Sequence, residues 1–462
     1  MKNKLIITSL ILLLVPFFSV AQEGTKTEKP NIIVIVADDM GWGDSSTYGN
    51  KVIKTPNLDK LAKQGVKFTQ GYSAAGVCSP SRSAILTGRT PYRNGVWRHL
   101  SGADPAPAHL RKSEITYPKL FQEAGYETGH FGKWHLLSRY QFKNEKFPHP
   151  DDHGYDYWFA TQNNAFPNHR NPINFVRNGK PVGKLEGYSA PLVADEAISW
   201  LNTKRDPTKP FLMSVWFHEP HAPIKTDIKF SELYPNETAK NKAYFGNVTQ
   251  MDFALGEIMK TLESQGVADN TLVVFTSDNG PVERFGGNTG GLRGNKRDDF
   301  EGGIRVPFIM RWPGYITANT QSNIPVIGTD IFTTLLSIGH LNVPQDRTID
   351  GVNLLPAIQG KKLTRTIPLF WRTHVSPAES RVAVRDGDWK IVADETLTKF
   401  MLFNVETDAN EAHDLAATMP QKLKSMKSLL IKTWQNISAE GPRHWWEDKV
   451  KGELGKDSKY IY

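Results

Sequence analysis

The chain of 462 residues is long enough for one large core, or for a large and a small domain. Its aromatic content of 11% and charged content of 23% are typical of a folded protein and exclude a disordered one. The single cysteine excludes a disulfide within the chain. The net charge is +8, but the sequence has no lysine- or arginine-rich run and no nucleic-acid-binding motif, and this argues against a nucleic-acid partner.

The first residues have the pattern of a cleavable secretory signal. Lys2 and Lys4 precede an apolar stretch at 5–18, and the Ser-Val-Ala sequence at 19–21 is a small-residue cleavage site. The apolar stretch is shorter than the ~20 residues that a membrane-spanning helix needs. We therefore expect residues 1–21 to be a signal peptide whose removal lowers the net charge from +8 to +6. We expect the mature protein to have no membrane span and to be exported to the periplasm, with secretion as the other destination.

Apolar runs and helical periodicity then alternate along the chain. Continuous apolar runs predict strands buried on both faces at 31–37, 211–217 and 271–276. Further strands are expected at 127–131 and 304–312. Helical patterns lie at 57–64, 117–124, 192–202, 239–265 and 330–338. This alternation predicts an α/β fold, with helices on both sides of a layered sheet.

The pattern changes around residues 360–370. Short strands are predicted at 381–385, 389–392 and 399–403, and a helix from 420 to 435 follows them. These elements predict a small antiparallel sheet with a C-terminal helix. We therefore place the larger domain at 30–365, and a C-terminal antiparallel-sheet subdomain with a tail at 366–462.

The lone cysteine, Cys78, lies at a predicted helix start. Pro80 suits the first turn of a helix, and Gly88 suits its end. A side chain at a helix N-terminus faces unpaired N–H groups and the positive end of the helix dipole. This environment favours an anion.

Acidic residues follow two of the predicted buried strands. Asp38 and Asp39 come directly after the strand at 31–37, and Asp278 and Asn279 come just after the strand at 271–276. In open α/β sheets, ligands bind beyond the carboxyl ends of the strands. Each acidic pair alone is also an ordinary turn sequence. Together they would supply three carboxylates and an amide, an all-oxygen site for a hard divalent cation.

The run Cys-Ser-Pro-Ser-Arg-Ser-Ala-Ile-Leu-Thr-Gly at 78–88 matches, without a gap, the signature of the type I sulfatases. The chain resembles this family over residues 30–430. The resemblance implies an alkaline-phosphatase-like fold, in which a large mixed sheet has helices on both faces and a smaller C-terminal antiparallel sheet carries a helix. It also implies that Cys78 is converted to formylglycine (3-oxoalanine) by a formylglycine-generating or other sulfatase-maturating enzyme.

Further motifs extend the resemblance residue by residue. Gly-Lys-Trp-His at 132–135, Pro-His-Ala-Pro at 220–223 and Gly-Leu-Arg-Gly-Asn-Lys at 291–296 match family elements in the family order. The resemblance implies one bound cation, which we expect to be Ca²⁺ because Mg²⁺ prefers a tighter octahedral shell and keeps its waters. The implied metal ligands are Asp38, Asp39, Asp278 and Asn279, and the implied catalytic residues are Cys78, Arg82, Lys133, His135, His221 and Lys296.

A chemical argument supports the conversion of Cys78. A thiol that attacked sulfur would form a thiosulfate-type adduct with no simple route for sulfate release, whereas the formylglycine hydrate carries two hydroxyls on one carbon. In the family mechanism one hydroxyl attacks sulfur while His221 protonates the leaving alcohol. The other hydroxyl, deprotonated by His135, then expels sulfate. The metal, Arg82 and the two lysines are expected to stabilise charge on the transferring group.

The substrate lies outside these motifs. Exported sulfatases of this type act on sulfated glycans, so the candidates are ulvan, carrageenan or another algal glycan, and glycosaminoglycan, with exo or endo action open. Arg98, His99, His169 and Arg170 are candidate contacts to an anionic sugar, although each residue type is also common in purely structural positions. Three alternatives remain at this point. They are a phosphonate or phosphate ester hydrolase of the same superfamily, a scavenger of aryl sulfates, and a non-catalytic pseudoenzyme that binds sulfated glycan.

Overall fold

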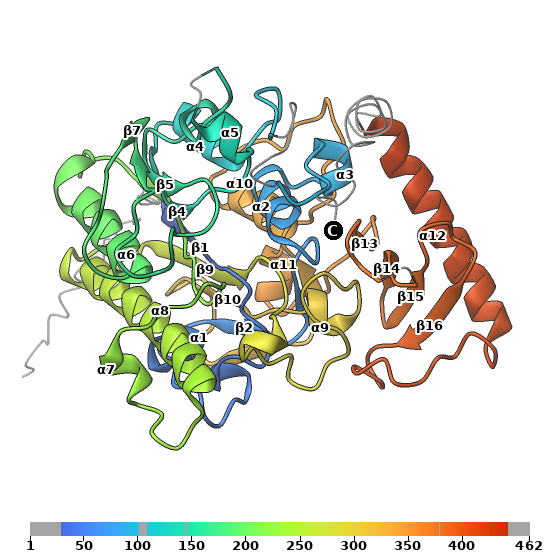
Figure 1. Ribbon diagram of the computed structural model, residues 1–462. Helices are drawn as coiled ribbons and strands as arrows, with labels where there is room; N and C mark the ends of the chain where they lie inside the picture. Colours follow the sequence, from blue (N-terminus) through green and yellow to red (C-terminus); the bar gives the residue numbers. More distant parts are fainter. Residues whose placement is uncertain (1–28, 101–108, 144–145, 378, 442–462) are drawn as a thin grey trace, which may run out of the picture.

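The computed structural model describes residues 29–100, 109–143, 146–377 and 379–441 (Figure 1). The predicted signal peptide at 1–21 and the tail from residue 442 lie outside these residues. The largest feature is a ten-stranded mixed sheet with the order β11-β2-β10-β9-β1-β8-β4-β5-β6-β7. Its strands are β1 (Asn31–Ala37), β2 (Val66–Phe68), β4 (Glu127–Lys133), β5 (Tyr157–Thr161), β6 (Val176–Arg177), β7 (Lys180–Pro181), β8 (Phe211–Trp216), β9 (Thr271–Ser277), β10 (Phe308–Arg311) and β11 (Thr320–Ser322).

Five neighbouring strands in the middle of this sheet, β9-β1-β8-β4-β5, are parallel. Antiparallel pairs add β10 beside β9 and β6 beside β5. Parallel neighbours present their carboxyl ends at the same edge of the sheet. The residues that follow β9, β1, β8 and β4 are therefore brought to one place.

Strand β1 shows why its sequence is apolar without alternation. Ile32, Val34 and Val36 belong to the hydrophobic core on one face of the sheet, and Ile33 and Ile35 belong to the core on the other. All five are 0% exposed, and each such side chain contributes about 1.5–3 kcal/mol when it leaves water. The prediction of strands buried on both faces is confirmed.

Helices cover both faces (Figure 1). One core includes residues of α2 (Cys78–Thr87), α4 (Tyr117–Glu123) and α10 (Asp330–Ile338). The other includes residues of α1 (Pro56–Lys63), α6 (Ser189–Ser199) and α8 (Ala239–Ser264). The remaining elements before the C-terminal sheet are β3 (Gly71–Tyr72), α3 (Pro91–Asn94), α5 (Arg139–Phe142), α7 (Ile228–Ser231), α9 (Glu301–Ile304), β12 (Val326–Ile327), α11 (Leu355–Ile358) and the short turns at Ser46–Tyr48, Asp151–His153, Trp200–Lys204 and Glu283–Phe285.

The C-terminal part forms an antiparallel sheet of four strands, covered by one long helix. Val384, Ile391 and Leu402 pack against the helix, whereas the opposite face of the sheet packs against the main body of the protein (Figure 1). The elements are β13 (Leu369–Arg372), β14 (Val382–Asp386), β15 (Trp389–Ala393), β16 (Phe400–Asn404) and α12 (Pro420–Glu440). The predicted fold class is confirmed, and β13 is an addition that the sequence pattern did not indicate.

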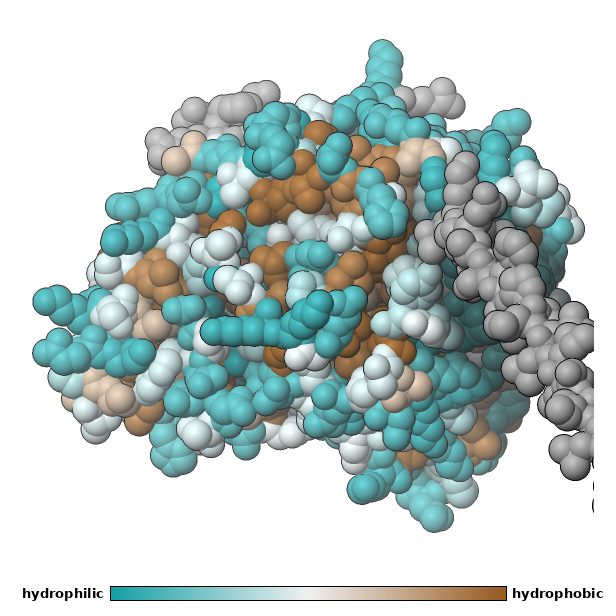
Figure 2. All heavy atoms as spheres, turned by 180° about the vertical axis from the view of Figure 1, so that it is seen from behind, coloured by the Kyte–Doolittle hydropathy of each residue, from teal (hydrophilic) through white to brown (hydrophobic). Residues whose placement is uncertain are grey.

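Figure 2 shows the molecule from behind, with hydrophilic residues over most of the surface and hydrophobic side chains gathered toward the middle. Within the described residues, no helix has the length and apolar character needed to cross a membrane.

Candidate active site

The ends of β1 and β9 lie side by side. Their register pairs Ala37 with Ser277, and the Asp278 backbone N–H donates a hydrogen bond of 3.1 Å to the Ala37 carbonyl oxygen. Asp38 and Asp39 on one strand end therefore meet Asp278 on the other, and all three carboxyl groups are buried. Asp39 adopts a left-handed backbone with φ 65°. Such backbone strain in a residue other than glycine is often concentrated at functional sites.

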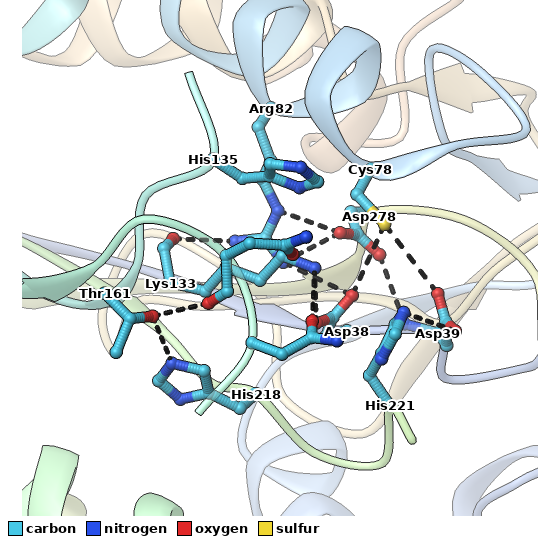
Figure 3. A network of polar contacts seen from close by, with 12 residues as sticks. Asp38, Asp39, Cys78, Arg82, Lys133, His135, Thr161, His218, His221 and Asp278 are labelled. Atoms are coloured by element: carbon cyan, nitrogen blue, oxygen red, sulfur yellow. Dashed lines mark hydrogen bonds and ion pairs between the residues drawn. The ribbon is translucent and has the colours of Figure 1, made fainter. Parts of the chain in front are cut away.

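Cys78 is the first residue of α2, and the helix points its N-terminus at the acidic strand ends (Figure 3). The Cys78 thiol donates to Asp38 Oδ1 at 3.6 Å, and its Sγ lies 3.9 Å from Asp39 Oδ1. Burial raises the pKa of this thiol, and the Asp278 carboxylate raises it further. The unconverted cysteine is therefore protonated, because burial and the acidic neighbours outweigh the helix N-terminus.

Three cations pair with the three carboxylates, and these six residues are here called the catalytic charge cluster. Burial alone would raise the pKa of Asp38, but Lys133 and the other nearby cations hold it well below its usual range. The pairs are Lys133 Nζ with Asp38 Oδ2, Lys296 Nζ with Asp39 Oδ1, and Arg82 Nη2 with Asp278 Oδ2, each at 2.7 Å. The ends of β1, β4 and β9 and helix α2 place five of these residues close to Cys78 (Figure 3). The sixth, Lys296, comes from the loop between the turn at Glu283–Phe285 and α9.

The oxygen donors of this cluster fit a divalent cation. Asn279 Nδ2 donates to Asp39 Oδ1 at 2.7 Å and to the Gly280 carbonyl oxygen at 2.9 Å. Asn279 Oδ1 is buried and has no hydrogen-bond partner within the described part of the chain. A buried acceptor left without a donor is costly, and a hard cation bound by Asn279 and the carboxylates would satisfy it. The residues present therefore form a candidate site for a divalent metal.

A ring nitrogen of His135 lies within 4.8 Å of Cys78 Sγ. Its Nε2 donates a hydrogen bond of 2.9 Å to the Leu100 carbonyl oxygen, so Nε2 carries the proton of the neutral ring. Its Nδ1 is buried and has no hydrogen-bond partner among the described residues. Burial, followed by the charge of Lys133, lowers the pKa of His135 well below its usual value. The ring is therefore neutral, with its lone pair on Nδ1, which is the state that a general base requires.

His221 stands at the edge of the cluster, beside Asp39 (Figure 3). Its Nδ1 contacts the Ala222 carbonyl oxygen, and its Nε2 lies 3.5 Å from Asp39 Oδ2. Its side chain is 18% exposed, in contrast to the fully buried Arg82 and Lys133. Burial lowers the pKa of His221 to about 4, although Asp39 opposes the shift. His221 thus contacts the cluster and is partly exposed to solvent.

Glu219, which the sequence did not connect with the site, anchors the segment that carries His221. Its Oε1 accepts hydrogen bonds from Ser189 Oγ at 2.6 Å and from the Ala190 backbone N–H at 2.8 Å, at the start of α6. Its carbonyl oxygen accepts the Asp38 backbone N–H at 3.0 Å. Glu219 therefore ties the ends of β8 and β1 to α6. No local pattern indicates this role, because the partners come from three separate segments.

Two motif glycines allow parts of the site to approach closely. A Cβ atom added at Gly132, which has φ 106°, would lie 2.0 Å from the Trp216 carbonyl oxygen. A Cβ atom at Gly280 would lie 2.1 Å from the Gly302 carbonyl oxygen. Both distances are impossible contacts, so glycine is required where these motif segments touch.

The four candidate substrate contacts are placed differently from one another. His99 is brought next to the site, with its ring centroid 4.6 Å from that of His135. Arg98 beside it is 9% exposed. His169 is fully buried behind the site, where its Nδ1 lies 3.4 Å from Glu219 Oε1, and Arg170 is exposed. The structure thus brings His99 next to His135, and it places His169 against Glu219.

Comparisons with known proteins agree with this architecture. The model of the sulfatase family matches residues 30–341, and a model described as N-sulphoglucosamine sulphohydrolase, C-terminal, matches residues 294–438. N-acetylgalactosamine-6-sulfatase of Rattus norvegicus is 36% identical over 370 residues, which cover 74% of this chain and 68% of the relative. Arylsulfatase H of Canis lupus familiaris is 33% identical over 427 residues, which cover 73% of this chain and 74% of that protein.

Solved structures give the same result. The crystal structure of Ps i-CgsB matches with a TM-score of 0.82 and 28% identity, covering 94% of this chain and 100% of that chain, and it has also been solved in complex with k-i-k-neocarrahexaose. A structure from work on the metabolism of multiple glycosaminoglycans by Bacteroides thetaiotaomicron has a TM-score of 0.75 and 26% identity, covering 88% and 99% of the two chains.

These matches define a sulfuric ester hydrolase built on a mixed sheet with a C-terminal antiparallel sheet. The chain belongs to the sulfatase family, and the resemblance found in its sequence is confirmed.

Proposed function

We propose that this protein is an exported sulfatase that removes sulfate from a sulfated polysaccharide or oligosaccharide, with Cys78 converted to formylglycine and with calcium at the acidic strand ends. One observation carries the proposal. The buried Cys78 lies at a helix N-terminus within 3.9 Å of carboxylate oxygens of both Asp38 and Asp39. The buried Arg82 and Lys133 and the partly buried Lys296 pair with the carboxylates of this site. A sulfate ester is an anion, and this arrangement supplies the fixed positive charge that would hold its oxygens.

The sulfur atom of Cys78 marks where the reactive oxygens of the converted residue would lie. The formylglycine hydrate would supply two hydroxyls on one carbon, one for attack on sulfur and one for the release of sulfate. Lys133 and Lys296 each have an ammonium group beside this position, on Asp38 and Asp39 respectively. They would bind sulfate oxygens as point charges, while the Arg82 guanidinium fixes Asp278 in place.

The two histidines would divide the proton transfers between them. His135 is neutral, its Nδ1 has no hydrogen-bond partner among the described residues, and its ring lies close to Cys78. It would therefore accept the proton from a hydroxyl of the converted residue. His221 presents Nε2 at the outer edge of the cluster, where it would give a proton to the leaving alcohol. The negative charge of a bound sulfate ester would raise the pKa of His221 and favour the protonated ring.

Calcium fits the donor set better than magnesium. Asp38, Asp39, Asp278 and Asn279 would bind the ion through oxygen atoms supplied by two strand ends, and a sulfate oxygen would complete its shell. The ion would supply a positive charge that polarises the ester and offsets repulsion of the incoming nucleophile. Asn279 Oδ1, buried without a partner among the described residues, supports this assignment.

The relatives support a glycan as the substrate. A relative at 36% identity is named for N-acetylgalactosamine 6-sulfate, and a similar structure was solved with a neocarrahexaose. Carrageenan, another algal glycan such as ulvan, and glycosaminoglycan therefore remain the candidates. The signal-like residues 1–21 support export to the periplasm or outside the cell.

The test is sulfate release from a panel of defined oligosaccharides derived from glycosaminoglycan, carrageenan and ulvan. The protein is co-expressed with a formylglycine-generating enzyme, and matching phosphate esters serve as the comparison. We expect release from one glycan class, at a higher kcat/KM than for the phosphate esters. A higher kcat/KM for the phosphate esters would favour the phosphonate or phosphate ester hydrolase instead. Binding of sulfated glycan without sulfate release would favour the non-catalytic pseudoenzyme.

A further inference from the structure

A pocket of about 530 Å³ opens next to His221, on the outer side of the catalytic charge cluster. Its wall includes His221, Pro223, Ile224 and Phe285. Apolar side chains of this kind form a surface on which the less polar face of a sugar ring can stack. Because His221 forms part of the wall, the pocket lies on the side of the cluster to which a leaving alcohol would point.

Two cations line the same pocket. Lys240 comes from the first turn of α8, and Arg284 comes from the turn at Glu283–Phe285. Both side chains are exposed, and neither makes a hydrogen bond or an ion pair within the described part of the chain. The Arg284 guanidinium lies 4.8 Å from the ring centroid of Phe285, which also lines the pocket.

Lys240 differs from the other two lysines of α8, each of which has an acidic partner. Lys242 lies 3.8 Å from Glu232, and Lys260 makes an ion pair of 2.6 Å with Glu257. Lys240 and Arg284 are therefore available for an anion that the protein itself does not supply. A pocket with an apolar wall and two unpaired cations suits a sugar unit that carries its own negative charge.

We infer that this pocket is a subsite for a second anionic group of the substrate, a sulfate or a uronate carboxylate on the leaving-group side of the scissile ester. The inference rests on the proposed function and adds the substrate class: the preferred glycan carries at least two anionic groups. Lys240 and Arg284 would bind the second group, and Phe285 and Ile224 would contact the ring between the two anions.

The test measures kcat and KM for oligosaccharides of the panel that differ in the number of anionic groups. Each monosulfated sugar is compared with a form that carries a second sulfate and with a form linked to a uronic acid, so that the two kinds of anion are distinguished. The variant Lys240→Gln with Arg284→Gln is compared with the wild type and with Lys260→Gln, which removes a paired lysine from the far end of α8.

We expect the wild type to show a lower KM for one of the doubly charged forms. The double variant should raise that KM about three- to tenfold and leave kcat unchanged, because the contact is the same in the ground and transition states. It should leave the KM of the monosulfated sugar unchanged, and Lys260→Gln should leave all values unchanged. Added salt should reduce the difference in wild-type KM between the singly and the doubly charged sugars, because it screens the interaction between the second anion and the two cations.

Two outcomes would overturn parts of the account separately. Equal effects of the double variant on singly and doubly charged sugars, or no effect on either, would overturn the subsite and leave the proposed function intact. A wild-type protein that releases sulfate from no member of the panel would overturn the proposed function and the subsite with it.

Discussion

Two groups of buried charges in this protein have similar chemistry and different surroundings. The catalytic charge cluster lies at the carboxyl ends of parallel strands, beside Cys78. The second group, here called the interface charge cluster, consists of Glu301, Lys390 and Glu411, where the C-terminal sheet meets the main body. Lys390 Nζ lies 3.0 Å from Glu301 Oε1 and 2.9 Å from Glu411 Oε1, and all three side chains are 0% exposed.

The difference between the clusters shows that buried charge alone does not define an active site. The catalytic charge cluster lies beside Cys78 and has a left-handed backbone at Asp39. Next to it, Asn279 Oδ1 has no hydrogen-bond partner among the residues that the structure describes. The interface charge cluster instead connects segments. The Glu301 backbone N–H donates to Glu411 Oε2 at 2.7 Å, and Tyr72 Oη donates to Glu301 Oε2 at 2.7 Å. Its charges pair with one another and connect separate segments, whereas those of the site also lie beside Cys78.

One loop joins the two clusters. Lys296 reaches Asp39 in the site, whereas Arg293 Nη1 donates to the Glu411 carbonyl oxygen at 3.0 Å, and Glu301 follows a few residues later. The C-terminal sheet therefore helps to position Lys296. Substitutions in the two clusters should separate activity from stability.

The largest effect is expected for Cys78→Ala. Removal of the nucleophile precursor should lower sulfate release at least about 1,000-fold. The free energy of unfolding should change by about 1 kcal/mol or less, because alanine nearly fills the same buried space. Sulfate release and thermal unfolding are measured on the same preparation. Cys78→Ser, which has a single hydroxyl and cannot complete sulfate release, should accumulate a sulfated protein that is detectable by intact mass.

Metal removal should act on the catalytic charge cluster alone. Treatment with EGTA should lower kcat by about 100-fold or more, because the positive charge beside the ester is lost. Ca²⁺ should restore activity and raise the melting temperature in a concentration-dependent way, since it binds only the folded protein. Full restoration by Mg²⁺ without an effect of Ca²⁺ would contradict the choice of calcium. Activity that persists in EGTA would contradict the metal site.

Substitution in the interface charge cluster should lower stability strongly and activity only weakly. Lys390→Met leaves Glu301 and Glu411 buried without their cation and should lower the free energy of unfolding by about 3–5 kcal/mol. The kcat of the folded fraction should fall less than tenfold, by about 1 kcal/mol in barrier height, because Lys296 keeps its contact with Asp39. Denaturant unfolding and kcat are measured together. The variant that also carries Glu301→Gln and Glu411→Gln should recover part of the stability, and unchanged stability of Lys390→Met would show that the cluster is not structural.

The smallest expected effect is a pH dependence of stability. Burial would raise the pKa of Glu301, but Lys390 and then Arg305 and Arg385 lower it to about 2, below its ordinary value of 4.5. The stabilisation from ionised Glu301 is therefore complete above about pH 4.5 and is lost as the pH falls toward 2, by about 2–3 kcal/mol. Calorimetry of the wild type and of Glu301→Gln between pH 3 and 6 should show a smaller loss in the variant. Parallel curves for the two proteins would contradict this assignment.

Much of the site was predictable because the chemistry lies at strand ends. The apolar run at 31–37 and the acids after it place Asp38 and Asp39 at the edge of a sheet, and the same argument applies to Asp278. The helix that begins with Cys78 was indicated by Pro80 and by Gly88, whose φ of 68° ends it in the left-handed conformation. These features are local, so a single sequence is sufficient to find them.

The parts that were not predictable depend on contacts between distant segments. Nothing near Leu100 indicates that its carbonyl oxygen fixes the tautomer of His135. No local pattern indicates that Glu219 anchors α6 or that His169 packs behind it. The partners of Lys390 are Glu301, 89 residues earlier in the chain, and Glu411 on the far side of β16. Strand β13 is only four residues long, too short to show a clear alternation of polar and apolar residues.

The central claim is that Cys78 acts after conversion and not as a thiol. The most direct measurement combines peptide mass spectrometry of Cys78 with sulfate release, for protein made with and without a formylglycine-generating enzyme. The account predicts that sulfate release rises in proportion to the fraction of Cys78 found as formylglycine, and that it is absent where the thiol is intact. Equal sulfate release by protein that retains an unmodified Cys78 would contradict it.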